Sequence, residues 1–231
     1  MEDTGTSLRI LNEEIVACRK CPRLVAYRGR VAREKRRAYR DWTYWGRPVP
    51  GFGDARAEVL ILGLAPAAHG ANRTGRMFTG DRSGDFLYAA LHKAGFANQP
   101  RSAHCDDGLQ LLNAYVSATI RCAPPENKPL PSEIAHCRGY LLREIEILQP
   151  RAVLALGKIA WDAYLDILKQ RGLIASRAAF PFSHGAETDL PGGTRLFAMY
   201  HPSQQNTQTR RVTQAMYARV LRRLKRFLQD E

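Results

Sequence analysis

Short apolar runs alternate along the chain with longer segments whose apolar residues recur at helical spacing. Four runs predict buried strands, at residues 59–62 (VLIL), 111–121 (LLNAYVSATIR), 152–156 (AVLAL) and 195–200 (RLFAMY). Amphipathic segments predict helices at about 83–95, 132–148, 158–169 and 209–228. Apolar strands that alternate with helices indicate an α/β fold, with a parallel sheet covered by helices on both faces.

The first 56 residues follow a different pattern. Residues 8–28 predict a helix that is interrupted at Cys18–Pro22, and a loop rich in Pro and Gly at 41–54 follows it. No repeat or low-complexity segment divides the chain. We therefore interpret residues 1–231 as one domain, with an extension at 1–56 and an α/β core at 57–231.

Right-handed crossovers would bring four loops to one edge of the sheet: GLAPAAHG (63–70), CAPPENKP (122–129), the turn at Gly157 and HPSQQN (201–206). Open α/β sheets bind their ligands at this edge. The first of these loops continues as far as Asp81, and the whole segment GLAPAAHGANRTGRMFTGD (63–81) has neither a Walker lysine pattern nor GxGxxG. It is therefore the predicted centre of the site, with a chemistry other than phosphate cradling.

The distribution of charged residues indicates which class of partner the protein binds. The formal net charge is +13, and residues 19–47 carry eleven basic side chains against two acidic ones. A second basic cluster lies between Arg219 and Arg226. These clusters favour binding to a polyanion, although a solvated basic face is the alternative. Within the loop at 41–54, Trp42, Tyr44 and Trp45 could stack on bases or pack over an edge of the sheet.

The hydropathy of the chain indicates its cellular compartment, and its cysteines indicate a possible cofactor. No apolar run approaches the ~20 residues of a membrane helix and the start MEDTG is no signal peptide, so we expect a cytoplasmic protein without membrane contact. Five cysteines then favour metal or redox chemistry over disulfides. Cys18, Cys21, Cys122 and Cys137 could together hold zinc or an iron-sulfur cluster, or be unrelated buried thiols; Cys105 lies in a polar loop and is left out.

The long motifs resemble those of one family. GLAPAAHGANRTGRMFTGD (63–81), YHPSQQNTQTR (200–210), RCAPPENKP (121–129) and YWGRPVPGFGD (44–54) are similar to the type 5 uracil-DNA glycosylases of the uracil-DNA glycosylase superfamily. This resemblance implies an α/β/α sandwich around a four-stranded parallel sheet. It also implies a structural 4Fe-4S cluster on Cys18, Cys21, Cys122 and Cys137, which would tie down the N-terminal extension.

The activity implied by the resemblance is hydrolysis of the N-glycosidic bond of uracil in DNA, leaving an abasic site. The uracil nucleotide would be flipped out of the duplex, and an oxocarbenium-like transition state would place negative charge on the departing base. Type 5 relatives are associated with other deaminated bases, including hypoxanthine. No motif residue is a lysine poised to form a Schiff base, so no lyase activity is expected. We also expect a monomer.

Site residues follow from the same motifs. The resemblance implies that Phe78 stacks on the flipped base, that Asn127 reads its edge, and that His201 donates to a uracil oxygen. Gly63 and Ala65 would belong to the base-binding wall. Core packing for Phe78, a turn-forming role for Asn127 and a structural role for His201 are the alternatives.

Two further groups complete the predicted site. The apolar pair Leu64 and Ala65 replaces the acidic or amide residue of other glycosylase families, which leaves Asp81 as the carboxylate of the motif. Asp81 is equally suited to catalysis and to capping the next helix. Gln205, Asn206 and Arg210 are predicted to contact the DNA backbone, with a solvated loop as the alternative.

Two other function classes remain in view. A non-catalytic iron-sulfur module that binds damaged DNA would show the same charge and cysteines. A metal-dependent nuclease would need paired carboxylates at the strand ends, and the sequence offers no such pair.

Overall fold

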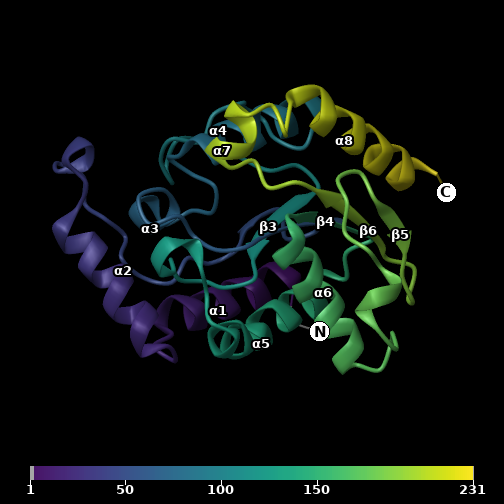
Figure 1. Cartoon of the computed structure of the whole chain (residues 1–231), viewed down its shortest axis with the longest axis horizontal. Coiled ribbons are helices and arrows are strands. Elements are labelled where there is room, and N and C mark those ends of the chain that lie inside the picture. Colours follow the sequence, from purple (N-terminus) through teal and green to yellow (C-terminus); the bar gives the residue numbers. More distant parts are fainter. Residues whose placement is uncertain (1–2, 231) are drawn as a thin grey trace.

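The computed structural model describes residues 3–230. Within this range six strands form one mixed sheet in the order β1-β3-β2-β4-β6-β5 (Figure 1). The strands are β1 (Phe52–Gly53), β2 (Val59–Gly63), β3 (Ala114–Ala118), β4 (Ala152–Leu156), β5 (Glu187–Asp189) and β6 (Arg195–Met199). The central four run parallel, and β1 and β5 add antiparallel edges.

Helices cover both faces of this sheet. Alternate side chains of β2 point to opposite sides, because Val59 and Ile61 belong to one apolar core and Leu60 and Leu62 to the other. The first core is closed by α4 (Arg82–Ala94) and α8 (Gln214–Gln229), and the second by α5 (Pro131–Leu148) and α6 (Lys158–Gln170). The predicted three-layer arrangement is therefore what the structure shows. No helix within residues 3–230 has both the length and the apolar character to span a membrane.

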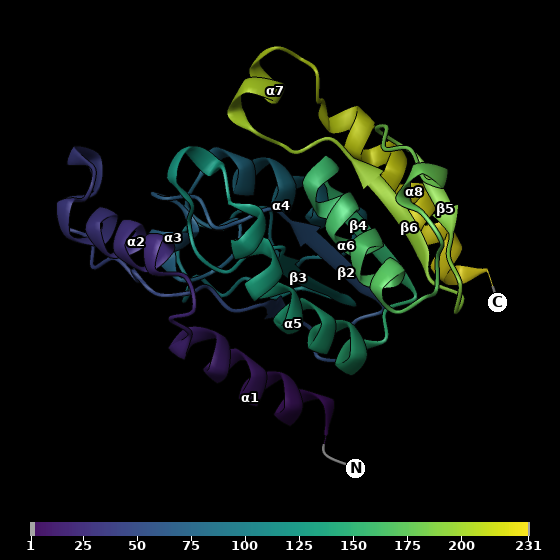
Figure 2. The ribbon, with the colours of Figure 1, turned by 60° about the horizontal axis from the view of Figure 1, so that its bottom comes forward.

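The N-terminal extension lies outside these layers. Helix α1 (Thr4–Ala17) packs along α5 through Leu11, Ile15 and Tyr140 (Figure 2). Helix α2 (Pro22–Glu34) and the 3-10 turn η1 (Arg37–Tyr39) continue away from the sheet beside α3 (Ala71–Thr74). The chain then returns through the loop that leads to β1.

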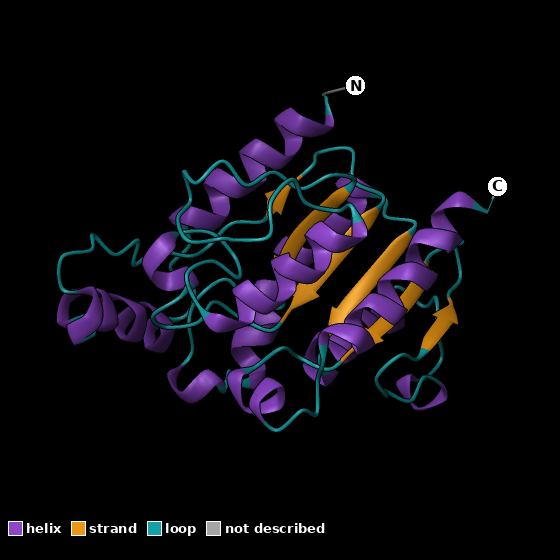
Figure 3. Ribbon diagram, turned by 90° about the horizontal axis from the view of Figure 1, so that it is seen from above, coloured by secondary structure: helices purple, strands orange, loops and turns teal. Residues whose placement is uncertain are grey.

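The strand carboxyl ends share one edge, where loops and short helices gather (Figure 3). These are the loop between β2 and α4 with its short helix α3, the 3-10 turn η2 (Pro125–Asn127) and helix α7 (Gln204–Gln208). The 3-10 turn η3 (Arg177–Ala179) follows α6 and lies beside it, with Arg177 paired to Asp162 and Asp166 of that helix. The predicted ligand edge is therefore formed by the predicted segments.

Several boundaries differ from the sequence predictions. The sheet has six strands rather than four, because β1 and β5 have two and three residues and are too short to show periodicity. The strand predicted at 111–121 spans only 114–118, since Asn113 has a left-handed backbone (φ 52°). The helix predicted from residue 209 begins at Gln214, where Thr213 caps it and Arg210 is left-handed (φ 56°). The helix predicted at 8–28 is two helices, Thr4–Ala17 and Pro22–Glu34, which extend beyond the predicted range at both ends and are separated at the predicted interruption.

Candidate active site

A cavity of about 400 Å³ opens at the carboxyl ends of the parallel strands. We call it the base cavity. Its lining comes from the loop after β2, the start of α4, η2 and the segment from β6 into α7: Leu64, Ala65, Ala67, Phe78, Asp81, Ser83, Asn127, His201, Ser203, Gln204 and Gln205. Residues up to 141 positions apart in sequence thus line one cavity. Six of the predicted site residues meet here: Ala65, Phe78, Asp81, Asn127, His201 and Gln205.

Phe78 is held in an unusual backbone conformation. Its φ of 52° is left-handed, which is costly for a bulky residue and persists only where the surroundings enforce it. Gly63, the last residue of β2, lies directly behind the ring, because a Cβ there would come 2.8 Å from the Phe78 Cζ. Gly63 therefore does not line the base cavity itself but makes room for the ring that does.

His201 follows the last parallel strand, β6. Its ring centroid lies 6.0 Å from that of Phe78, with 34° between the planes. The side-chain amide of Asn206 donates to the His201 carbonyl oxygen at 2.9 Å, which fixes the backbone at the strand end. Burial lowers the His201 pKa to about 4. The imidazole is therefore neutral near pH 7 and can donate a hydrogen bond without carrying a charge.

Asp81 caps α4 and also lines the base cavity. Its Oδ1 accepts a hydrogen bond from the Gly84 backbone N–H at 2.9 Å, so the predicted N-cap is confirmed. Burial raises the Asp81 pKa. Gly70 permits this position, because a Cβ there would lie 2.0 Å from Asp81 Oδ2. Capping and a place in the wall are compatible, since one carboxylate oxygen is sufficient for the cap.

Asn127 combines a turn with a position at the cavity. It follows Glu126 in η2, and both have left-handed backbones with φ of 57° and 53°. Such φ values are unusual outside glycine but are best tolerated by Asn and Asp. The side chain is exposed at the cavity rim. The turn-forming interpretation therefore describes the backbone correctly and leaves the amide available to a ligand.

The three residues predicted to contact DNA occupy different settings. Gln205 is exposed and lines the base cavity. Asn206 is half-buried, and its side-chain amide nitrogen is engaged with His201. Arg210 is exposed in the turn between α7 and α8 and does not line the cavity.

The aromatic residues of the loop at 41–54 pack within the protein. Tyr44 is buried with its hydroxyl 3.0 Å from His69 Nδ1, and Trp45 Nε1 donates to the Pro48 carbonyl at 2.9 Å. The ring of Trp42 lies 4.0 Å from the guanidinium of Arg73. The packing interpretation therefore describes these rings better than base stacking does.

The four cysteines proposed as metal ligands line one small cavity between α2, α5 and the end of β3. Cys21, Cys122 and Cys137 are buried and Cys18 is half-buried. Burial and the neighbouring thiols raise the pKa of Cys21 to about 11 and that of Cys122 to about 12. A metal is bound by thiolates, so a cation at this site would have to displace these protons.

The spacing and surroundings of these sulfurs test which group fits. Among the described residues, no three of these sulfurs lie within 4.8 Å of one another. Zinc bonds of ~2.3 Å would place four sulfurs about 3.8 Å apart. Arg121 also lines this cavity, and its buried Nε and Nη1 have no hydrogen-bond partner. The four sulfurs and these two donors therefore fit a metal-containing group that can also accept hydrogen bonds.

Cys105 lies apart from this set. It is exposed, and its sulfur and the ligand atoms of His104 and Asp106 lie within 4.8 Å of one another. These three consecutive residues could coordinate a cation from solvent. They share no segment with the base cavity or the four cysteines.

Comparison with known proteins assigns the family. The family model described as the uracil DNA glycosylase superfamily matches residues 50–225. The chain is 51% identical to the type-5 uracil-DNA glycosylase of Thermus thermophilus, over 93% of this chain and 95% of the relative. It is also 51% identical to the type-5 uracil-DNA glycosylase of Mycobacterium tuberculosis, over 94% and 80% respectively. A type-4 uracil-DNA glycosylase of Pyrobaculum aerophilum is 30% identical over 71% of this chain and 67% of the relative.

The chain therefore belongs to the uracil DNA glycosylase superfamily, and within it to the type 5 group, as its motifs predicted. The match places both long motifs, residues 63–81 and 200–210, inside the family region. The cysteines at 18 and 21 precede that region but lie within the extent of the type-5 relatives, given their coverage of over 90% of the chain.

Sequence reasoning missed some of the residues around these sites. Ser203 lines the base cavity and caps α7, with its Oγ 3.2 Å from the Asn206 backbone nitrogen. A serine directly before the first residue of a helix is a recognisable capping signal. His136, with Nδ1 3.4 Å from Cys21 Sγ, had no such signal, because only the fold brings α5 to α2.

Proposed function

We propose that this protein is a DNA repair glycosylase that hydrolyses the N-glycosidic bond of uracil in DNA and leaves an abasic site. The observation that carries the proposal is the base cavity, where Phe78, Asp81, Asn127 and His201 meet at the strand ends. The type-5 names of relatives that are half identical over nearly the whole chain support it. Residues 1–231 would act as a single domain.

A flipped uracil would enter the base cavity with one face against the Phe78 ring. The Asn127 amide offers both a donor and an acceptor to the pyrimidine edge. As the glycosidic bond stretches, negative charge develops on the uracil, and the neutral His201 imidazole would donate to a uracil oxygen. A neutral donor stabilises this charge without an ion pair in the ground state, so its effect is concentrated in the transition state.

Asp81 has the complementary task at the sugar. An anionic carboxylate at the cavity wall would stabilise the oxocarbenium-like sugar and orient the attacking water. Burial raises the pKa of Asp81, so its charge is more costly in the free enzyme and is better compensated once positive charge develops. No lysine is found among the described residues that line the cavity, which supports hydrolysis without lyase action.

The wall also bears on substrate range. Leu64, Ala65 and Ala67 give one side of the base cavity an apolar, small-residue surface. Such a surface makes few polar demands and should accept other deaminated bases such as hypoxanthine. We expect uracil and hypoxanthine to compete for the same site.

We further propose that Cys18, Cys21, Cys122 and Cys137 hold a 4Fe-4S cluster, for which their place around one cavity and the unpartnered Arg121 nitrogens provide support. When bound, the cluster supplies a structural crosslink between the N-terminal extension and the core. Without it, α2 would be held to the core mainly by polar contacts. Protein as isolated should absorb near 400 nm; colourless protein with one zinc per chain would contradict this assignment.

One assay separates the glycosylase from its alternatives. A labelled duplex with a single uracil is incubated with the protein in EDTA and then treated with hot alkali. Strand cleavage that depends on alkali supports the glycosylase, whereas cleavage without alkali indicates nuclease or lyase action. Binding without any cleavage would leave the non-catalytic DNA-binding module as the function.

A further inference from the structure

A second cavity, of about 480 Å³, adjoins the base cavity. We call it the flanking cavity. Both cavities share one wall, formed by Ala67, Asp81, Ser83, Asn127 and Gln204. A polymer that places one unit in the base cavity therefore meets the flanking cavity directly across that wall.

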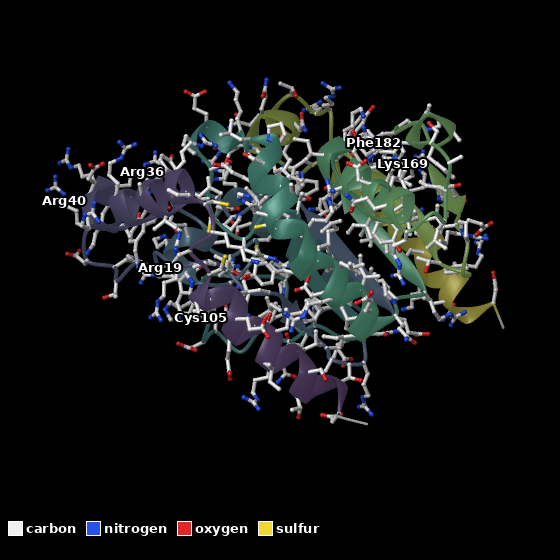
Figure 4. All side chains as sticks on the ribbon, turned by 90° about the horizontal axis from the view of Figure 1, so that it is seen from below. Arg19, Arg36, Arg40, Cys105, Lys169 and Phe182 are labelled. Carbon is white, nitrogen blue, oxygen red and sulfur yellow. The ribbon has the colours of Figure 1, made fainter. Side chains whose placement is uncertain are left out.

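The opposite wall of the flanking cavity comes from the N-terminal extension. Tyr27 of α2 and the neighbouring Arg36 and Tyr39 line it. Both tyrosines are half-buried, and Arg36 is exposed. Figure 4 shows Arg36 and Arg40 at the outer end of this extension. Aromatic faces beside a guanidinium are the combination that binds unpaired nucleotides, since rings stack on bases and the cation pairs with phosphate.

Part of this wall is rigid before any ligand arrives. The guanidinium of Arg73 lies 4.0 Å from the Tyr39 ring and 4.0 Å from the Trp42 ring. Arg73 is buried and donates to the carbonyl oxygens of His69, at 2.9 Å, and Gly80, at 2.7 Å. The loop after β2 thus holds the extension in place, and a ligand bound there loses less free energy to ordering.

The electrostatics of the flanking cavity suit a phosphodiester. Arg36 and Arg82 are the cationic side chains of its lining. Of the two carboxylates, Glu126 is paired with Lys128 at 3.1 Å, and Asp81 belongs to the shared wall. Burial and the nearby Arg36 and Arg73 lower the pKa of His69, which leaves a neutral imidazole in the lining. The unpaired charge on the outer wall is therefore positive.

We propose that the flanking cavity binds the nucleotide next to the flipped uracil on the same strand, in an unpaired state. Its base would lie against Tyr27 and Tyr39, and its phosphate near Arg36. The inference rests on the proposed function, because the flipped uracil defines which nucleotide is the neighbour. It assigns a specific task to a part of the basic N-terminal run, beyond general attraction to DNA.

The test uses duplexes with a single-stranded overhang in which uracil is the last nucleotide or is followed by one or two more. Overhangs at the 5′ and 3′ ends are both prepared. Binding is measured by fluorescence anisotropy with 2′-fluorinated uridine, which resists excision, and single-turnover excision with the natural nucleotide. The proteins are the wild type, Tyr27→Ala, Arg36→Ala and the matched control Arg40→Ala, which removes the same charge outside the cavity lining.

With the wild type, the first added nucleotide should raise affinity roughly tenfold on one side of the uracil, as expected for one stacked base. Tyr27→Ala and Arg36→Ala should lose most of this gain while keeping the affinity for terminal uracil, and Arg40→Ala should retain it. Tyr39 is left intact because it holds Arg73. Equal affinities along the wild-type series, or a gain that survives in both cavity variants, would overturn the inference. A fully paired uracil duplex tests the proposed function separately, since the anisotropy series does not depend on excision.

Discussion

Helices α2 and α6 each have 13 residues but are held in opposite ways. Helix α6 buries seven residues, including Trp161, Tyr164 and Leu165, against the sheet. Helix α2 buries only three, Leu24, Arg28 and Val31. Its contacts are largely polar: Arg23 forms two hydrogen bonds to Glu133, and the buried Arg28 donates to the Gly46 and Cys18 carbonyls.

The sheet with its covering helices and helix α2 are therefore stabilised by different interactions. The base cavity rests on strands and helices whose apolar burial is sufficient to fix them. Helix α2 has less of that burial and depends more on directed polar contacts and on the proposed cluster. Changes in the cavity should therefore alter chemistry with little effect on stability, and changes at the cysteines should do the reverse.

The largest effect should come from His201→Asn. Removal of the donor to the departing base should reduce single-turnover uracil release by about 10²–10³-fold, the usual loss for one such donor. His104→Asn, an exposed histidine outside the base cavity, serves as the control. Similar losses in both variants would mean that His201 has no special role.

Substitution of the cysteines should separate the two regions. Cys122→Ser should abolish absorbance near 400 nm and lower the melting temperature by about 10 °C, as expected for a loss of ~3 kcal/mol in a chain of this size. The matched change Cys105→Ser should leave both unchanged, because that thiol is exposed and lies apart from the other four. Retained colour in Cys122→Ser would remove this residue from the ligand set.

Asp81→Asn should lower excision by about tenfold or more without a comparable loss of stability, because Asn caps helices as well as Asp does. The raised pKa of Asp81 also predicts that the wild-type rate falls on acidification, as the carboxylate takes up a proton. The variant should lack this acid limb. Unchanged single-turnover rates in Asp81→Asn would exclude Asp81 from catalysis.

The smallest effect concerns pH and stability. The His201 pKa is about 4 in the folded protein, below the 6.5 of an unperturbed histidine. Between these values the unfolded chain binds a proton that the folded chain does not, so stability falls as the pH is lowered. Between pH 7 and 5 this loss should be about 2 kcal/mol and should be absent in His201→Asn. Urea unfolding of both proteins at the two pH values measures it.

Much of the core was predictable because its strands are apolar on both faces. The runs at 59–62 and 152–156 required no knowledge of their partners to be assigned. The edge strands β1 and β5 could not be predicted, because their pairing depends on the neighbours β3 and β6 rather than on their own residues. The break at Arg210 was hidden because the apolar stripe of α8 continues backward through the buried Val212, which is not helical.

The site divides in a similar way. Residues such as Phe78 and Asp81 could be predicted because one continuous motif, on which the family resemblance rests, contains them both. The positions of Asn206 beneath His201 and of His136 beside Cys21 depend on contacts made only after folding. For Asp81, the sequence left capping and catalysis as alternatives; the structure confirms the cap and also places the carboxylate in the cavity lining.

The distance along the chain between the paired cysteines has a consequence for synthesis. Cys18 and Cys21 leave the ribosome well before Cys137, which is 116 residues beyond Cys21. At ordinary translation rates this is a delay of roughly 6 to 23 s. During that interval α5, against which α1 packs, has not been synthesised, and the thiols of Cys18 and Cys21 remain unbound. If these cysteines hold the proposed cluster, the nascent N-terminus is exposed to oxidation and mispairing before the other two ligands exist.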